Sequence, residues 1–143
     1  MHIENFVIED YENAYKLWTN TKGMGMRSLD DSKDGIAKFL TRNPSTNFVA
    51  KINNEIIGVI LSGHDGRRGY IYHASVNVNY RNQGVGTKLL EAVYKSMKEE
   101  GINKVALVVF KTNDIGNTFW KSSGLEERND LNYYNISLNS QNI

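Results

Sequence analysis

The sequence Tyr70-Ile-Tyr-His-Ala-Ser-Val-Asn-Val78 and the turn Asn79-Tyr-Arg-Asn-Gln-Gly-Val-Gly-Thr87 that follows it decide the fold of this chain. The first segment is rich in β-branched and aromatic residues, which suit a half-buried strand. The second segment has two closely spaced glycines and predicts a tight turn out of that strand. The residues after the turn then show which kind of element the strand connects to.

An amphipathic helix is predicted after the turn, because apolar residues recur every four positions at Val85, Leu89, Val93 and Met97. Gly101 stands where a left-handed cap commonly ends such a helix. Residues 104–110 (Lys-Val-Ala-Leu-Val-Val-Phe) are nearly all apolar, which predicts a strand buried on both faces. Strand, helix and strand in this order predict a right-handed βαβ crossover.

The turn before this helix has the chemistry of a phosphate site. A helix N-terminus leaves its first backbone N–H groups unpaired and carries a partial positive charge. Gly84 and Gly86 have no side chains, so an anion can approach those N–H groups closely. Gln83, Thr87 and Lys88 can add further donors. A phosphate or pyrophosphate is therefore the expected ligand.

Two common phosphate-binding motifs do not fit the turn. A dinucleotide fingerprint requires a third glycine three residues after Gly86, where this chain has Leu89. A Walker A loop requires Gly-Lys-Ser/Thr, and the order here is Gly86-Thr87-Lys88. A general nucleotide-phosphate binder stays open as an alternative, for which ATP or NAD would be the preferred ligand.

The pattern Arg81-x-x-Gly84-x-Gly86, placed directly after a strand that ends Val76-Asn77-Val78, resembles motif A of the GNAT acetyltransferase superfamily. In that family the motif binds the pyrophosphate of acetyl-coenzyme A. A second block, which runs from Asn113 through Trp120 to Gly124, resembles the next conserved block of the same family. The resemblance extends over essentially the whole chain and is specific over residues 70–125.

The resemblance implies an α/β fold with a mixed sheet, in the order β-α-α-β-β-β-α-β-α-β, with acetyl-coenzyme A wedged between the fourth and fifth strands. It implies transfer of an acetyl group to a primary amine by direct attack in a ternary complex. It also implies main-chain contacts to the pantetheine arm from residues that flank a β-bulge. The cofactor-binding residues implied in this way are Ala74, Ser75, Val76, Arg81, Asn82, Gln83, Gly84, Val85, Gly86, Thr87 and Asn113.

The catalytic groups are less clear from the sequence. His73 is the most suitable base near the expected reaction centre, and Tyr72 is the next candidate as an acid or as a group that orders a water. Strand alternation predicts that these two side chains lie on opposite faces. Relatives commonly place an acidic Tyr where this chain has Trp120, whose indole cannot release a proton at useful pH. A base acting through water stays open.

The rest of the chain fits one domain, residues 1–143. The loop over residues 20–31 contains Gly23-Met24-Gly25-Met26, and the resemblance implies that it lines the acceptor site. Asn53-Asn54 predicts a tight hairpin. Strands are predicted over residues 3–8, 47–52, 55–62 and 132–138, and further helices over residues 11–19, 31–42 and 114–123.

Composition narrows the classes of function. The net charge of +1 gives no long-range attraction to nucleic acid or to an anionic membrane. The absence of cysteine excludes disulfides, and the three histidines show no spacing typical of a metal site, so no metal is expected. The first residues do not resemble a signal peptide, and a cytoplasmic location is expected.

The acceptor is not identified by the sequence, which allows an amino acid, a polyamine, a drug-like amine or a peptide N-terminus. A homodimer is also allowed. The alternative to an enzyme is a non-catalytic acyl-coenzyme A binding module that acts as a sensor or an interaction domain, and only turnover separates the two.

Overall fold

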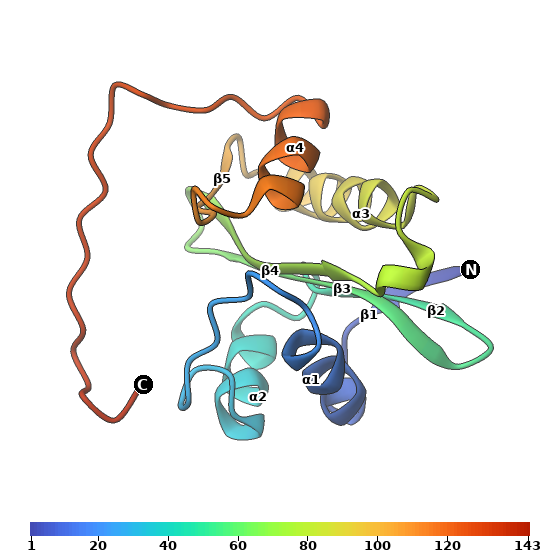
Figure 1. The fold of residues 1–143 in the computed structure, drawn as a ribbon. Coiled ribbons are helices and arrows are strands. Elements are labelled where there is room, and N and C mark those ends of the chain that lie inside the picture. The colour runs from blue at the N-terminus through green and yellow to red at the C-terminus, as the bar shows by residue number, and fades with distance from the viewer.

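The computed structural model describes all 143 residues as one mixed sheet with helices on both faces (Figure 1). The strands lie in the order β1-β2-β3-β4-β5, and every neighbouring pair is antiparallel except β4 and β5. The elements are β1 (His2–Asn5), α1 (Tyr11–Thr19), α2 (Lys33–Arg42), β2 (Phe48–Ile52), β3 (Glu55–His64), β4 (Gly69–Val76), α3 (Val85–Glu99), β5 (Val105–Leu107) and α4 (Asp114–Ser122), with 3-10 turns η1 (Ile8–Asp10) and η2 (Val78–Tyr80). The predicted α/β class is confirmed.

Two apolar clusters hold the layers together, one on each face of the sheet. Helices α1 and α2 cover one face, where Trp18 and Ile36 are buried against Val59 of β3 (Figure 1). Helices α3 and α4 cover the other face, where Leu89 and Met97 are among the buried residues. The molecule therefore has three layers, and the two faces of β4 belong to different cores. No helix is long and apolar enough to cross a membrane.

The predicted crossover from β4 through α3 to β5 is confirmed. The stripe Val85, Leu89, Val93 and Met97 is buried, as the four-residue spacing predicted. Gly101 follows α3 with φ +76, and the Ile102 N–H donates to the Met97 carbonyl at 2.9 Å, which completes a left-handed cap. The hairpin at Asn53-Asn54 is also confirmed, with φ +50 and +67 at the two residues.

The edge of the sheet differs from the prediction. The strand expected over residues 104–110 is paired only over Val105–Leu107, and Val108 and Phe110 are exposed by 55% and 59%. The strand expected over residues 132–138 does not form, so β5 has no neighbour on its outer side. That segment runs along the outside of the molecule (Figure 1). At the end of the chain, the Ile143 carbonyl accepts a hydrogen bond from the Ser28 N–H at 2.8 Å.

A β-bulge in β4 lies at a different residue from the one expected. His73 is paired with Leu61 and Ile71 with Ser62, which leaves Tyr72 as the extra residue. The expectation that Ala74, Ser75 and Val76 flank the bulge is therefore wrong, because these three residues continue the regular ladder with β3. A bulge reverses the side-chain alternation after it. It therefore decides which face of β4 each later side chain occupies.

Tyr72 and His73 lie on the same face of the sheet as a consequence of this bulge. The Tyr72 ring packs edge-on against Phe39 of α2, with ring centroids 5.4 Å apart. The His73 ring lies 5.1 Å from the ring of Trp18 in α1. Because α1 and α2 cover the same face, the prediction that the two side chains point to opposite faces is wrong.

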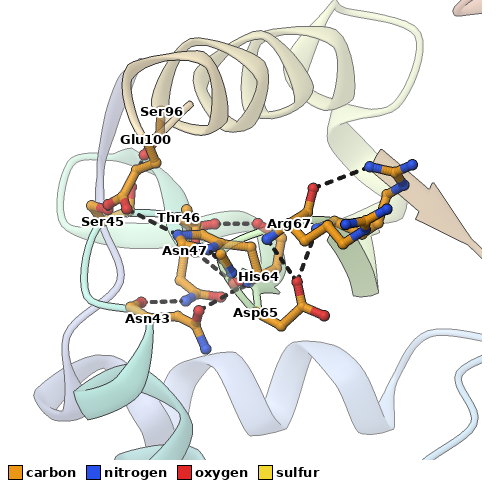
Figure 2. Close-up of polar contacts among 12 residues, drawn as sticks. Asn43, Ser45, Thr46, Asn47, His64, Asp65, Arg67, Ser96 and Glu100 are labelled. Atoms are coloured by element: carbon orange, nitrogen blue, oxygen red, sulfur yellow. Dashed lines mark hydrogen bonds and ion pairs between the residues drawn. The ribbon is translucent and has the colours of Figure 1, made fainter. Parts of the chain in front are cut away.

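A polar network lies where β3 and α3 end (Figure 2). Glu100 accepts a hydrogen bond from Ser45 Oγ at 2.7 Å and lies 2.9 Å from Nε2 of His64. The Gly66 N–H donates to Nδ1 of His64 at 2.9 Å, so Nε2 carries the proton that faces Glu100. This network joins the end of α3 to the β3–β4 hairpin.

Candidate functional site

The turn before α3 presents a row of unpaired backbone donors. The first hydrogen bond of the helix runs from the Lys88 N–H to the Gly84 carbonyl at 3.0 Å. None of the N–H groups of residues 82–87 has an acceptor within the protein. Asn82 and Gly84 both have positive φ, +60 and +82, and no side chain caps the helix. Such a turn forms a concave group of N–H dipoles that attracts an anion.

Glycine is favoured at the two positions of the turn for different structural reasons. At Gly84 a β-carbon would meet nothing within 4 Å, so the positive φ of +82 is the structural reason for glycine there. At Gly86 a β-carbon would lie 3.1 Å from the ring of Phe119 in α4. Gly86 is therefore required by the packing of α4 on α3, which the sequence alone did not indicate.

The predicted donors around the turn are only partly free. Arg81 Nε donates to the Val76 carbonyl at 3.3 Å, which ties the turn to the end of β4. Gln83 Nε2 donates to the Asn79 carbonyl at 3.4 Å. Thr87 is exposed and lines a hollow of about 260 Å³ between α3 and α4, next to Glu91. The backbone N–H groups and the exposed side chains of Thr87 and Lys88 therefore remain free as donors, while Arg81 and Gln83 shape the turn.

The strands β4 and β5 separate directly beside this turn. They are paired only from Gly69 with Val105 to Ile71 with Leu107, although β4 continues to Val76. The Asn77 N–H donates to Ile57 of β3, so the ladder alternation directs the N–H groups of Ala74 and Val76 to the opposite, unpaired edge. The gap between the strands therefore has main-chain donors along its β4 side.

The loop over residues 20–31 spans this gap on the α1/α2 face. A β-carbon on Gly23 would lie 2.8 Å from Nδ2 of Asn113, beyond the end of β5, so loop and side chain are in close contact. Gly25 approaches the ring of Phe110 in the same way. Asn113 also caps α4, because its Oδ1 accepts from the Gly116 N–H at 2.9 Å. Met24 and Met26 are partly buried and pack against the α1/α2 core.

The end of the same loop contacts β4 through a buried pair of titratable groups. His73 Nε2 lies 2.7 Å from Oδ1 of Asp31, with side-chain exposures of 10% and 5%. A carboxylate only accepts hydrogen bonds, so Nε2 carries the proton. Nδ1 of His73 has no partner within the protein. No local sequence pattern links Asp31 to His73, because 42 residues separate the two.

Tyr72 is the exposed member of the expected catalytic pair, at 54%. Burial raises its pKa, and the charges of Asp30 and Tyr133 raise it further. The phenol is therefore protonated at neutral pH and can donate a proton, but it is not a base there. The Tyr70 ring lies 4.8 Å from the Tyr72 ring.

Two buried polar atoms without partners accompany His73 on this face. Ser75 follows it by two residues on β4, and its Oγ has no hydrogen-bond partner. Trp18 packs on the His73 ring, and its Nε1 is also unpaired. Buried polar groups without partners are costly and uncommon in folded proteins. Ser75, expected to contribute only main-chain contacts, thus also brings an unpaired hydroxyl to this face.

Trp120 occupies the position expected for a proton donor, but its surroundings are apolar. Its ring lies 4.9 Å from that of Phe119, edge to face, and it packs against the cluster beneath α3. This placement explains the side chain as a packing residue of α4.

Comparisons with known proteins agree with this geometry. Residues 7–125 match the family described as "Acetyltransferase (GNAT) family". An acetyltransferase of Pectobacterium atrosepticum is 31% identical over 114 residues, which cover 80% of this chain and 79% of that protein.

Two solved structures have similar folds. An aminoglycoside acetyltransferase from an uncultured soil metagenomic sample, in complex with sisomicin, has a TM-score of 0.74 and 26% identity, over 95% of this chain and 96% of that one. The PaiA N-acetyltransferase of Thermoplasma acidophilum, in complex with coenzyme A, has a TM-score of 0.77 and 21% identity, over 87% of this chain and 89% of that one.

Proposed function

The chain belongs to the GNAT acetyltransferase family and is therefore an acyltransferase, and we propose that it transfers an acetyl group from acetyl-coenzyme A to a primary amine by direct attack in a ternary complex. The observation that carries this proposal is the juxtaposition of two sets of free backbone donors. One set is the row of N–H groups at residues 82–87, and the other is the unpaired edge of β4 beside it.

The two sets fit the two parts of the cofactor. The concave group of N–H dipoles at residues 82–87 suits the pyrophosphate, because both its positive potential and its donors favour an anion. The N–H groups of Ala74 and Val76 face the gap and suit the amide-rich pantetheine arm, as a further strand would pair with them. Asn113 lies across the gap and offers its side-chain amide.

The proposed reaction has three requirements. The nitrogen lone pair of a neutral amine forms a bond to the thioester carbon, and the carbonyl oxygen gains negative charge, which the Val76 N–H would stabilise. The amine loses a proton, for which we propose Nδ1 of His73. The carbon–sulfur bond breaks, and the thiolate takes a proton, for which Tyr72 is the proposed donor. The products are an N-acetyl amide and free coenzyme A.

We place the acceptor amine on the α1/α2 face of the gap. The loop over residues 20–31 closes this side, and Tyr72 is exposed there close to Asp30. An aromatic ring near a carboxylate attracts a cationic amine. The aminoglycoside acetyltransferase noted above, which is 26% identical, supports an amine acceptor of this kind.

Thermal melting with acetyl-coenzyme A, ATP and NAD tests the cofactor. A ligand at 100 times its dissociation constant stabilises a fold by about 2.7 kcal/mol, which gives a clear shift. Gly84→Glu places a negative side chain among the donors and should remove the shift. Gly101→Glu is the matched control, because Gly101 also has positive φ and open space but lies at the other end of α3.

A screen of amines for release of free thiol then tests turnover. Release with an amine present supports the transferase. A melting shift without any release indicates the binding module instead. A larger shift with ATP or NAD than with acetyl-coenzyme A contradicts the assignment of the turn.

A further inference from the structure

We propose that Asp31 is a positioning residue for His73, which orients the imidazole so that Nδ1 accepts the proton of the attacking amine. The inference rests on the proposed function. It adds a residue of the acceptor loop that lies outside the sequence motifs. It also makes a specific claim about the reaction, because it states which ring nitrogen is the base and what holds it there.

Asp31 is fixed by hydrogen bonds at all of its polar groups. Its Oδ1 faces His73 Nε2, and its Oδ2 accepts from the Arg27 N–H, both at 2.7 Å. Its carbonyl accepts from the Tyr11 hydroxyl at 2.7 Å, and its N–H donates to the Arg27 carbonyl at 3.1 Å. The residue is only 4% exposed. A carboxylate held in this way cannot turn away from the imidazole without breaking several buried contacts.

This arrangement selects one tautomer of His73. The proton lies on Nε2 because Oδ1 can only accept, and the lone pair is left on Nδ1. Trp18 packs against the ring, so the imidazole cannot easily rotate. When Nδ1 takes the amine proton, the ring becomes positively charged, and the adjacent Asp31 stabilises that charge while it stays ionised itself.

Few other charges act on the ring. Asp31 is the one group that contacts a ring nitrogen of His73 within the protein. From α1 the ring faces Trp18, and the Tyr11 hydroxyl is already bonded to Asp31. Tyr72 precedes His73 on β4, and Asp30 on the loop acts on Tyr72. No lysine or arginine side chain pairs with His73 or Asp31. Removing the Asp31 carboxylate therefore leaves the imidazole without a charged partner.

The pair also links the base to the acceptor loop. Asp31 closes the loop over residues 20–31, whose Gly23 end lies against Asn113 across the gap. The orientation of the imidazole therefore depends on a residue of the acceptor loop.

The test is Asp31→Asn, with Asp34→Asn as the matched control, since Asp34 is exposed on the first turn of α2 and has no ion pair. An asparagine keeps the size of the side chain but can donate to Nε2 and so favour the other tautomer. We expect kcat to fall by about tenfold or more while KM for acetyl-coenzyme A stays the same, because general bases contribute roughly 10²–10⁴ in rate.

The split between kcat and KM separates positioning from a merely structural role. Loss of folded protein alone lowers the apparent kcat only in proportion to the folded fraction, which thermal melting measures independently. A fall in kcat no larger than the loss of folded protein overturns the inference.

A double-mutant comparison completes the test. If Asp31 acts through His73, then Asp31→Asn should have no further effect on kcat in a His73→Ala background. Additive effects would overturn the positioning role. Retained thiol release in every variant would show that the acetyltransferase function stands while this inference fails, so the two failures are distinguishable.

Discussion

Gly86 lies against Phe119 so closely that a β-carbon at position 86 would be 3.1 Å from two carbons of the ring. The contact joins the first turn of α3 to α4, and α4 begins directly after Asn113. The glycine-rich turn therefore has two functions in this fold. It leaves the donors of α3 open, and it brings α4 close enough to position Asn113 at the gap.

Gly86→Ala should lower the free energy of unfolding by about 1–3 kcal/mol, because the new methyl group would lie 3.1 Å from the Phe119 ring and would displace it. Urea denaturation measures this change. Phe119→Leu replaces the ring with a smaller side chain. The effects of the two substitutions on the free energy of unfolding should therefore be less than additive. Equal effects of Gly86→Ala in both backgrounds would show that the ring is not the obstacle.

Asn113 has two roles that substitutions can separate. Asn113→Ala removes the cap of α4 and should lower the free energy of unfolding by about 1 kcal/mol. Asn113→Asp keeps the capping oxygen but loses the amide donor beside the gap. We expect Asn113→Asp to melt close to the wild-type temperature and to bind acetyl-coenzyme A more weakly. Equal binding by wild type and Asn113→Asp would leave only the capping role.

The polar network at the end of α3 predicts a dependence of stability on pH. The hydrogen bond from Ser45, and after it that of His64, lowers the pKa of Glu100. A carboxyl whose pKa is lower in the folded state stabilises the fold above its ordinary pKa, and this contribution is lost as the pH falls through the folded value. Glu100→Gln should therefore reduce the loss of stability between about pH 6 and pH 3. Glu99→Gln, on the exposed surface beside it, is the control for the melting curves.

The loop before α2 is held by the end of the chain. Asn142 Oδ1 accepts from the N–H groups of Leu29 and Asp30, both at 3.0 Å, and its Nδ2 donates to Asp30 at 2.8 Å. Asn142→Ala should therefore speed hydrogen exchange at those two amides without changing exchange in β3 or β4. Hydrogen exchange measured by NMR tests this. Unchanged protection at residues 29 and 30 would show that the contact is not maintained in solution.

The prediction of strands was less successful than that of helices, for a physical reason. The repeat in α3 is local, since each residue of the stripe is one turn from the next, and Gly101 marks the end within the same segment. A strand needs a partner elsewhere in the chain. The segment at residues 132–138 has strand-like residues, but it finds no pairing with β5, whose regular part ends at Leu107.

In the candidate site, too, some features depend on neighbouring residues and others depend on contacts between distant parts of the chain. The sequence alone determined the turn at Gly84, the helix after it and the family resemblance, because each depends on neighbouring residues. Only the tertiary structure decided that Tyr72 and His73 share a face, since one extra residue in β4 reverses the alternation. Only the tertiary structure brought Asp31 to His73, because the packing of α1 and α2 on the sheet closes a separation of 42 residues that no local pattern encodes.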